Sequence, residues 1–146
     1  MKFFTVAMAA LLILFSSCKK DNANSTSANA TSIAGSWEIR LAQNGMTPTI
    51  TYPSGNDSIL KFTATTWLRY SKGSLVKSGT YTIVNDSSFN ALVVPAGQFT
   101  RRIIYDGDTT SHKIFFQITG KTLTIVSGVF ALDYGSYTEY ELVPDM

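Results

Sequence analysis

Three small groups of residues in this chain have types and spacings that could perform chemistry. His112 is the single histidine, a residue type that serves as a general base or as a zinc ligand. Asp106 and Asp108 are separated by one glycine, and closely spaced carboxylates of this kind bind calcium in loops. Glu139 and Glu141 share one face of a predicted strand, with backbones about 6.5 to 7 Å apart, and paired carboxylates can hydrolyse glycosides.

Each group also has a simpler structural explanation. No second histidine accompanies His112, and the single cysteine is distant in sequence, so a zinc site would need an unusual set of carboxylates. The segment DGDTTSHKI contains no Glu to complete a calcium loop, and its DG pair is typical of a hairpin turn. Glu139 and Glu141 lie on the polar face of their strand. The sequence also contains no nucleophile elbow and no phosphate-binding loop, so we predict no enzymatic activity, no metal and no cofactor.

The cysteine, Cys18, lies at the boundary between an apolar segment and a polar one. Lys2 precedes an almost entirely apolar run, 3–15, which is shorter than the roughly 20 residues that a membrane-spanning helix needs. Ser16 and Ser17 then supply the small residues that precede a cleavage site. A positive start, an apolar run and small residues are together typical of an export signal.

The sequence LLILFSSC that ends at Cys18 resembles the lipobox of bacterial lipoproteins, and CKKDN resembles the start of many lipoproteins from the Bacteroidota. The resemblance implies that residues 1–17 are a cleaved signal peptide. It also implies that Cys18 is acylated, with palmitate among its chains, and anchors the protein in the outer membrane, in either leaflet. An ordinary signal peptide with an unpaired cysteine nearby is the alternative. Residues 18–32 are polar, and we expect a flexible tether there.

The remainder, 33–146, is long enough for one domain with one core. The formal net charge of the precursor is +2 and falls to +1 when Lys2 is removed with the signal peptide. A nearly neutral chain lacks the clustered basic face that nucleic-acid binding requires, so no nucleic-acid partner is expected. A single cysteine also excludes an internal disulfide.

Beyond Ile33, apolar and polar residues alternate with a period of two, and helical periodicity is missing. Turn sequences such as SKGS, NDSS, YDGD and TGK separate the alternating segments. The pattern therefore predicts an all-β fold, either an antiparallel barrel or a β-sandwich. The predicted strands carry these same-face residues in order: Trp37, Ile39 and Leu41; Leu60 and Phe62; Trp67 and Arg69; Tyr81 and Ile83; Leu92 and Val94; Ile103 and Tyr105; Ile114, Phe116 and Ile118; Leu123 and Ile125; Thr138, Tyr140 and Leu142.

The sequence IAGSWEIR, which begins at Ile33, is similar to the G-x-W start of lipocalin-like domains. The sequence KSGTYTIV, which begins at Lys77, is similar to strands of small bacterial lipocalin-like lipoproteins. The resemblance implies an antiparallel up-and-down β-barrel of about eight to nine strands. In such a barrel Gly35 would allow a tight entry and Trp37 would plug one end, whereas a β-sandwich is the alternative fold.

A barrel of eight strands either fills its interior with side chains or holds one small ligand. We therefore expect a membrane-anchored binding or accessory module for a small apolar ligand in the cell envelope. The alternative is a β-sandwich interaction protein that contacts another envelope protein or a host protein through the predicted loop 42–56. The candidate ligand-binding residues are Trp67, Arg69, Tyr81, Arg101, Tyr105, Phe116 and Tyr140.

Replacing Cys18 by Ser tests the expected anchor. Two or three acyl chains, each contributing about 0.8 kcal/mol per buried methylene, hold a protein firmly in a bilayer. We expect Cys18→Ser to move the protein from the membrane pellet to the soluble fraction, as measured by centrifugation and immunoblotting. A variant that stays in the pellet after a high-salt wash would contradict the lipid anchor.

Overall fold

The computed structural model describes residues 32–89, 98–128 and 135–145, which form nine strands and no helix. Within these ranges there is accordingly no helix that is long and apolar enough to cross a membrane. The strands are β1 (Gly35–Asn44), β2 (Ile50–Thr51), β3 (Ile59–Phe62), β4 (Thr66–Ser71), β5 (Ser74–Asn85), β6 (Arg101–Tyr105), β7 (Ile114–Thr119), β8 (Thr122–Ser127) and β9 (Ser136–Val143).

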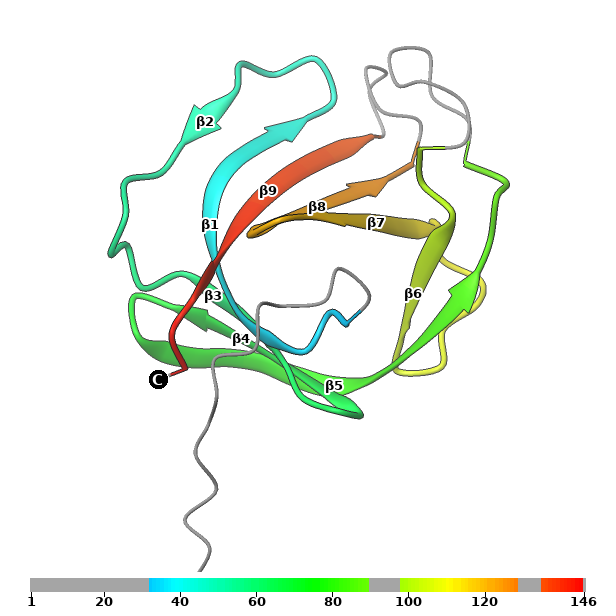
Figure 1. Cartoon of the computed structure of the whole chain (residues 1–146). Coiled ribbons are helices and arrows are strands. Elements are labelled where there is room, and N and C mark those ends of the chain that lie inside the picture. Colours follow the sequence, from blue (N-terminus) through cyan, green and yellow to red (C-terminus); the bar gives the residue numbers. More distant parts are fainter. Residues whose placement is uncertain (1–31, 90–97, 129–134, 146) are drawn as a thin grey trace, which may run out of the picture.

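Eight of the nine strands in the described ranges form a closed antiparallel barrel. Strands β3 to β9 follow β1 in chain order around the sheet, and β9 pairs back with β1, from Ser36↔Val143 to Asn44↔Ser136. Figure 1 shows β1 and β9 curving side by side, with β2 outside the ring, where it pairs with β1. The predicted up-and-down, lipocalin-like barrel is therefore confirmed. The β-sandwich alternative is wrong, because β1 and β9 join the strands into one sheet.

Two tight turns lie where the sequence predicts them, one connecting β4 directly to β5 and one opening the longer connection 106–113 between β6 and β7. Lys72 and Gly73 have φ angles of 50° and 76°, and Asp106 and Gly107 have φ angles of 53° and 73°. Two successive positive φ angles match the right-handed twist of the flanking strands. The predicted NDSS turn follows the end of β5 at Asn85, and the backbone N–H of Ser88 donates a hydrogen bond of 2.9 Å to Asp86 there. The strand predicted around Leu92 and Val94 lies outside the described residues.

A β-bulge in β1 changes which side chains face the barrel interior. The register of β1 against β9 shifts between Ile39↔Tyr140 and Leu41↔Glu139. An extra residue in one strand reverses the alternation beyond it. As a result Leu41 pairs with Glu139, on the outer face, while Ala42 lies inside opposite Thr138. The prediction that Leu41 shares a face with Trp37 and Ile39 is therefore wrong.

The end of the barrel where β1 enters is filled by large apolar side chains. Trp37 is 1% exposed, and its Nε1 donates a hydrogen bond of 2.8 Å to the carbonyl oxygen of Ile33. Phe62, Phe116 and Leu123 are buried in the same cluster. Each such side chain contributes about 1.5 to 3 kcal/mol when it is fully buried. This end of the barrel is therefore a packed core.

A smaller apolar cluster lies on the outer face of the barrel. Phe115 and Phe116 are adjacent in β7 and both are buried, but they point to opposite faces. Phe89 packs on Phe99 and Phe115, with ring centroids 5.0 Å and 5.1 Å apart. Phe89 and Phe99, which lie between β5 and β6 in the chain, thus cover the outward side chain of Phe115.

Removing the Trp37 side chain tests the packed end. Because the indole is buried and its N–H is paired, we expect Trp37→Ala to lower the free energy of unfolding by about 3 to 5 kcal/mol in urea titrations. The matched control is Leu75→Ala, at a side chain that is 53% exposed, which should change stability by less than about 0.5 kcal/mol. Equal urea unfolding curves for the Trp37→Ala variant and the wild type would contradict the role of Trp37 in the packed end.

Candidate functional site

A cavity of about 600 Å³ occupies the barrel interior beyond the packed core. It is open to solvent, since Arg69, Lys77 and His112 are exposed residues of its lining. Its volume lies within the range of about 300 to 1,000 Å³ that is typical of small-molecule sites. The lining comprises Ile39, Ala42, Asn44, Tyr52, Leu60, Trp67, Arg69, Lys77, Arg102, Ile103, Tyr105, Asp108, Ser111, His112, Ile114, Ile125, Ser127, Ser136, Thr138 and Tyr140.

The cavity exists because small residues occupy one wall. Ala42 of β1, Ser127 of β8, and Ser136 and Thr138 of β9 all line it. Ser127 pairs with Ser136, and their hydroxyls are 2.6 Å apart, so the two groups satisfy each other's hydrogen bonding. A barrel of this size is only just wide enough for its side chains to fill it. Short side chains at this level therefore leave space that the large residues at the packed end do not.

Aromatic rings form a continuous wall from the packed core to the cavity. Trp67 and Tyr105 both line the cavity and make an edge-to-face contact, with ring centroids 5.0 Å apart. Tyr105 also stacks on Phe62 at 6.4 Å, and Phe62 contacts Tyr81 edge-on at 5.0 Å. Such pairs add about 0.5 to 1.5 kcal/mol beyond the burial of their surface. The wall is therefore held in place by the core before any ligand enters.

Three tyrosines line the cavity, Tyr52, Tyr105 and Tyr140, and none of their hydroxyls has a hydrogen-bond partner within the described residues. Burial raises the pKa of the Tyr105 hydroxyl, and the nearby hydroxyls of Tyr140 and Tyr81 raise it further. Burial also raises the pKa of Tyr140, while the positive charge of Arg69 acts in the opposite direction. Both phenols are therefore neutral donors at physiological pH, available to a molecule in the cavity.

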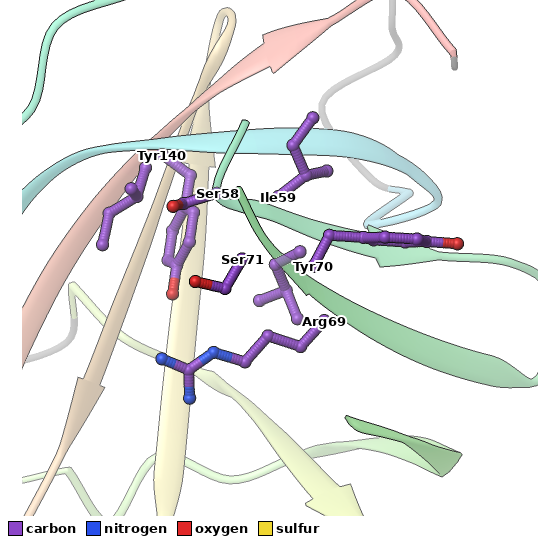
Figure 2. Close-up of a pocket in the computed structure, with 8 residues that line it drawn as sticks. Ser58, Ile59, Arg69, Tyr70, Ser71 and Tyr140 are labelled. Atoms are coloured by element: carbon purple, nitrogen blue, oxygen red, sulfur yellow. The ribbon is translucent and has the colours of Figure 1, made fainter. Parts of the chain in front are cut away.

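A small hollow of about 60 Å³ adjoins the cavity and shares Ile39, Leu60, Arg69 and Tyr140 with it. Figure 2 shows the Arg69 guanidinium and the hydroxyls of Ser71 and Tyr140 on one side of the hollow, while the Tyr70 ring points away. The volume is sufficient for a few water molecules. The shared residues make this hollow a side chamber of the larger cavity.

Two cationic side chains lie opposite each other at the mouth. Arg69 of β4 and Lys77 of β5 are directly paired across the two strands, and both line the cavity. The Lys77 Nζ atom is 5.5 Å from the centroid of the Trp67 ring, within range of a cation–π interaction. Within the described residues, the side chains of Arg69 and Lys77 make no hydrogen bond and no ion pair.

The structure places the predicted ligand-binding residues at two levels of the barrel. Trp67, Arg69, Tyr105 and Tyr140 line the cavity. Tyr81, Arg101 and Phe116 are not part of the lining and belong to its packed surroundings. The hydroxyl of Tyr81 donates a hydrogen bond of 2.7 Å to Thr63, and the Arg101 guanidinium lies 4.7 Å from the centroid of the Phe116 ring. Ligand contact therefore remains a prediction for the first four residues and is not supported by position for the other three.

His112 and Asp108 line the cavity, Asp106 does not, and the three residues form no assembled site. His112 is exposed, precedes β7 as predicted, and also lines the cavity. Asp108 accepts hydrogen bonds from the hydroxyls and backbone N–H groups of Ser111 and Thr110, which lower its pKa. Asp106 accepts a bond of 2.7 Å from the backbone N–H of Thr80. Within the described residues, no group of three or more His, Cys, Asp or Glu side chains could hold a metal ion.

One buried carboxylate, Glu38, was not predicted from the sequence. It lies outside the cavity, on the outer face of β1, and pairs with Arg40 at 2.5 Å. Burial alone would raise the pKa of Glu38, but hydrogen bonds from the backbone N–H of Gly55, from Arg40 and from the backbone N–H of Asp57 lower it. The carboxylate thereby fixes the loop that follows Tyr52, a residue of the cavity lining. Its role is structural.

The two glutamates of β9 are also engaged in contacts on the outer face. Glu141 accepts a hydrogen bond of 2.8 Å from Arg40 Nε, and Glu139 accepts one from the Tyr137 hydroxyl. Neither glutamate lines the cavity. Their position gives no support to glycoside chemistry.

Titration of the tyrosines tests the buried phenol of the cavity wall. A folded-state pKa above the ordinary value near 10 means that Tyr105 favours the folded state below about pH 10 and loses this contribution as the pH rises further. We expect Tyr105→Phe to remove a late-ionising component from the ultraviolet titration of the native protein. If Tyr105→Phe instead removes a component that ionises near pH 10, the Tyr105 phenol is exposed and this interpretation is wrong.

Comparison of the chain with protein-family models, with curated proteins and with solved structures finds no match in any of the three. The structure therefore shows a lipocalin-like architecture, and the sequence resemblance drawn from the segments that begin at Ile33 and Lys77 remains an expectation. A barrel fold hosts many unrelated functions, so the geometry of the cavity must support any functional conclusion.

Proposed function

We propose that this protein is a lipid-anchored protein of the cell envelope that binds one small, largely apolar ligand inside its barrel. The observation that carries the proposal is the open cavity of about 600 Å³, whose lining combines aromatic and aliphatic side chains with polar ones. Apolar burial supplies the binding energy, at about 25 cal/mol for each Å² removed from water. Ten of the twenty described lining residues are polar or charged, and these groups orient the ligand.

Rigid walls favour binding in such a cavity. Trp67 and Tyr105 are fixed by edge-to-face packing that continues into the core through Phe62. A site that is formed in advance avoids the cost of ordering side chains, which is about 0.5 to 1.5 kcal/mol for each long side chain that a ligand would otherwise immobilise. Ligand binding therefore requires little change in the barrel.

The lipid anchor is supported by the sequence around Cys18. An apolar run that is too short to span a bilayer, two serines and a cysteine at the boundary are the features expected of a lipoprotein signal. Ile33 and Trp37, near the start of the described residues, lie at the packed end, whereas the cavity lies farther along β1, at Ala42 and Asn44. A tether attached at residue 32 would leave the mouth unobstructed.

A contact with another envelope protein is the second candidate function. The described ranges expose Met46 (77%), Ile50 (54%), Leu75 (53%) and Val76 (56%), which lie just beyond β1, in β2 and at the start of β5. Exposed apolar side chains of this kind can mark an interaction surface. The barrel cavity is the stronger observation, because isolated exposed apolar residues are common on protein surfaces.

Native mass spectrometry can test whether a ligand is carried. The full chain with Cys18→Ser, purified from its own host without detergent, should retain a small molecule in about a one-to-one ratio. Thr138→Trp places an indole in the cavity next to the small residues of β8 and β9, so this variant should lose the molecule. The matched control is Thr82→Trp on β5, where the side chain is exposed outside the barrel, and this variant should keep it.

The melting curves of both Trp variants should confirm that they fold. A bare polypeptide in every preparation, together with a co-purifying protein partner, would favour the interaction protein instead. Retention of the small molecule by Thr138→Trp would place the binding site outside the cavity and contradict the proposal.

A further inference from the structure

The cavity holds more positive charge than negative charge. Among its described lining residues, Arg69, Lys77 and Arg102 are cations, and Asp108 is the one carboxylate. That carboxylate is already engaged by Thr110 and Ser111. The polar groups left for a ligand are therefore cations and neutral side chains, with no free carboxylate among the described lining residues.

Arg69 and Lys77 are a directly opposed pair of like charges. The two residues face each other across β4 and β5, where side chains of neighbouring strands lie about 4.5 to 5.5 Å apart at Cβ. Like charges in this arrangement destabilise a sheet, and no carboxylate within the described residues forms an ion pair with either one. The fold gains a cation–π contact between Lys77 and Trp67 but no ion pair within the described ranges, and a bound anion would relieve the repulsion between the two charges.

Unpaired buried donors are a second, independent observation. Within the described residues, the buried side-chain nitrogen and oxygen atoms that lack a hydrogen-bond partner are Trp67 Nε1 and Arg102 Nε. Both are N–H donors, and both belong to residues that line the cavity. A buried donor without a partner costs about 1 to 3 kcal/mol, so such groups call for an explanation.

Arg102 is only partly neutralised by its neighbours. Its NH1 atom lies 3.9 Å from Asp86, at the limit of an ion pair, and its NH2 atom is 3.5 Å from the carbonyl oxygen of Thr109. Lys113 holds the same Asp86 oxygen more closely, at 3.0 Å. The guanidinium therefore keeps hydrogen-bonding capacity at the edge of the cavity.

We propose that the ligand is an amphipathic organic anion, with its acidic head group between Arg69 and Lys77 and its apolar body against Trp67 and Tyr105. The inference rests on the proposed function and specifies the chemical class of the ligand. Charge-assisted hydrogen bonds to the two cations fix the head group, and the phenol of Tyr140 adds a neutral donor beside Arg69. The aromatic wall excludes water from the body of the ligand.

Two dyes with the same apolar body provide a direct test. Anilinonaphthalene sulfonate carries a negative charge, and phenylnaphthylamine lacks it. The full chain with Cys18→Ser is used without detergent, because acyl chains and micelles would dissolve both dyes. We expect the anionic dye to bind at least about tenfold more tightly in fluorescence titrations, which is the effect of one charged hydrogen bond.

Substitutions of Arg69 and Lys77 then test whether these two charges cause the preference for the anionic dye. The double variant Arg69→Gln with Lys77→Gln should weaken binding of the anionic dye about tenfold or more and leave binding of the neutral dye unchanged. Lys121→Gln is the matched control, since this exposed lysine of the β7–β8 turn is not part of the cavity lining. It should alter neither affinity.

A measurement on the unaltered cavity covers the case in which the double variant does not fold. Raising the ionic strength from about 0.01 M to about 0.1 M shortens the screening length from about 30 Å to about 10 Å. Binding of the anionic dye should weaken, and binding of the neutral dye should not.

The possible results separate this inference from the proposed function. Equal affinities for the two dyes, or a preference that survives loss of both cations, would overturn the anionic ligand and leave an apolar binding site in place. Failure of both dyes to bind would contradict the proposed function and, with it, this inference.

Discussion

Pairing of the first strand with the last is the constraint on which the rest of the structure depends. β1 pairs with β3, β2 and β9, and its contact with β9 turns a meander into a closed wall. Closure fixes the width of the interior, so the side chains at each level decide whether that level is solid or hollow. Trp37 and Phe62 fill the level where β1 begins, whereas Ala42 and Thr138 leave the level near its end unfilled.

The charged residues are divided between the two sides of this wall. On the outer face, Glu38 is paired with Arg40, and Asp86 is paired with Lys113. Hydrogen bonds to Ser88 and to Lys113 lower the pKa of Asp86 to about 2, so this carboxylate remains ionised over the physiological range. These outer groups hold loops against the strands. Arg69 and Lys77, which line the cavity, form no ion pair within the described residues, and this contrast makes them candidates for a role in binding.

The sequence was sufficient to predict the barrel and the inner face of most strands, because a period of two directly reports which side chains share a face. For this reason it identified Trp67, Arg69, Tyr105 and Tyr140 as residues that face the barrel interior. It could not separate them from Tyr81, Arg101 and Phe116, because depth along the barrel depends on the stagger between strands. It also missed the bulge that turns the Leu41 side chain to the outer face, and it missed the burial of Glu38. Both features arise from contacts between distant segments.

The separation of packed and hollow levels has a consequence for how such a protein can evolve. Substitutions that are far apart and share no partners usually have additive effects on stability. Arg69 and Lys77 contribute no ion pair within the described part of the chain, while the fold is secured by Trp37 and its neighbours at the other level. Substitutions at Arg69 and Lys77 can therefore change the net charge of the cavity mouth, and even its sign, without lowering the stability of the fold. Proteins that descend from one stable barrel can in this way acquire different ligands through a few substitutions at the cavity mouth.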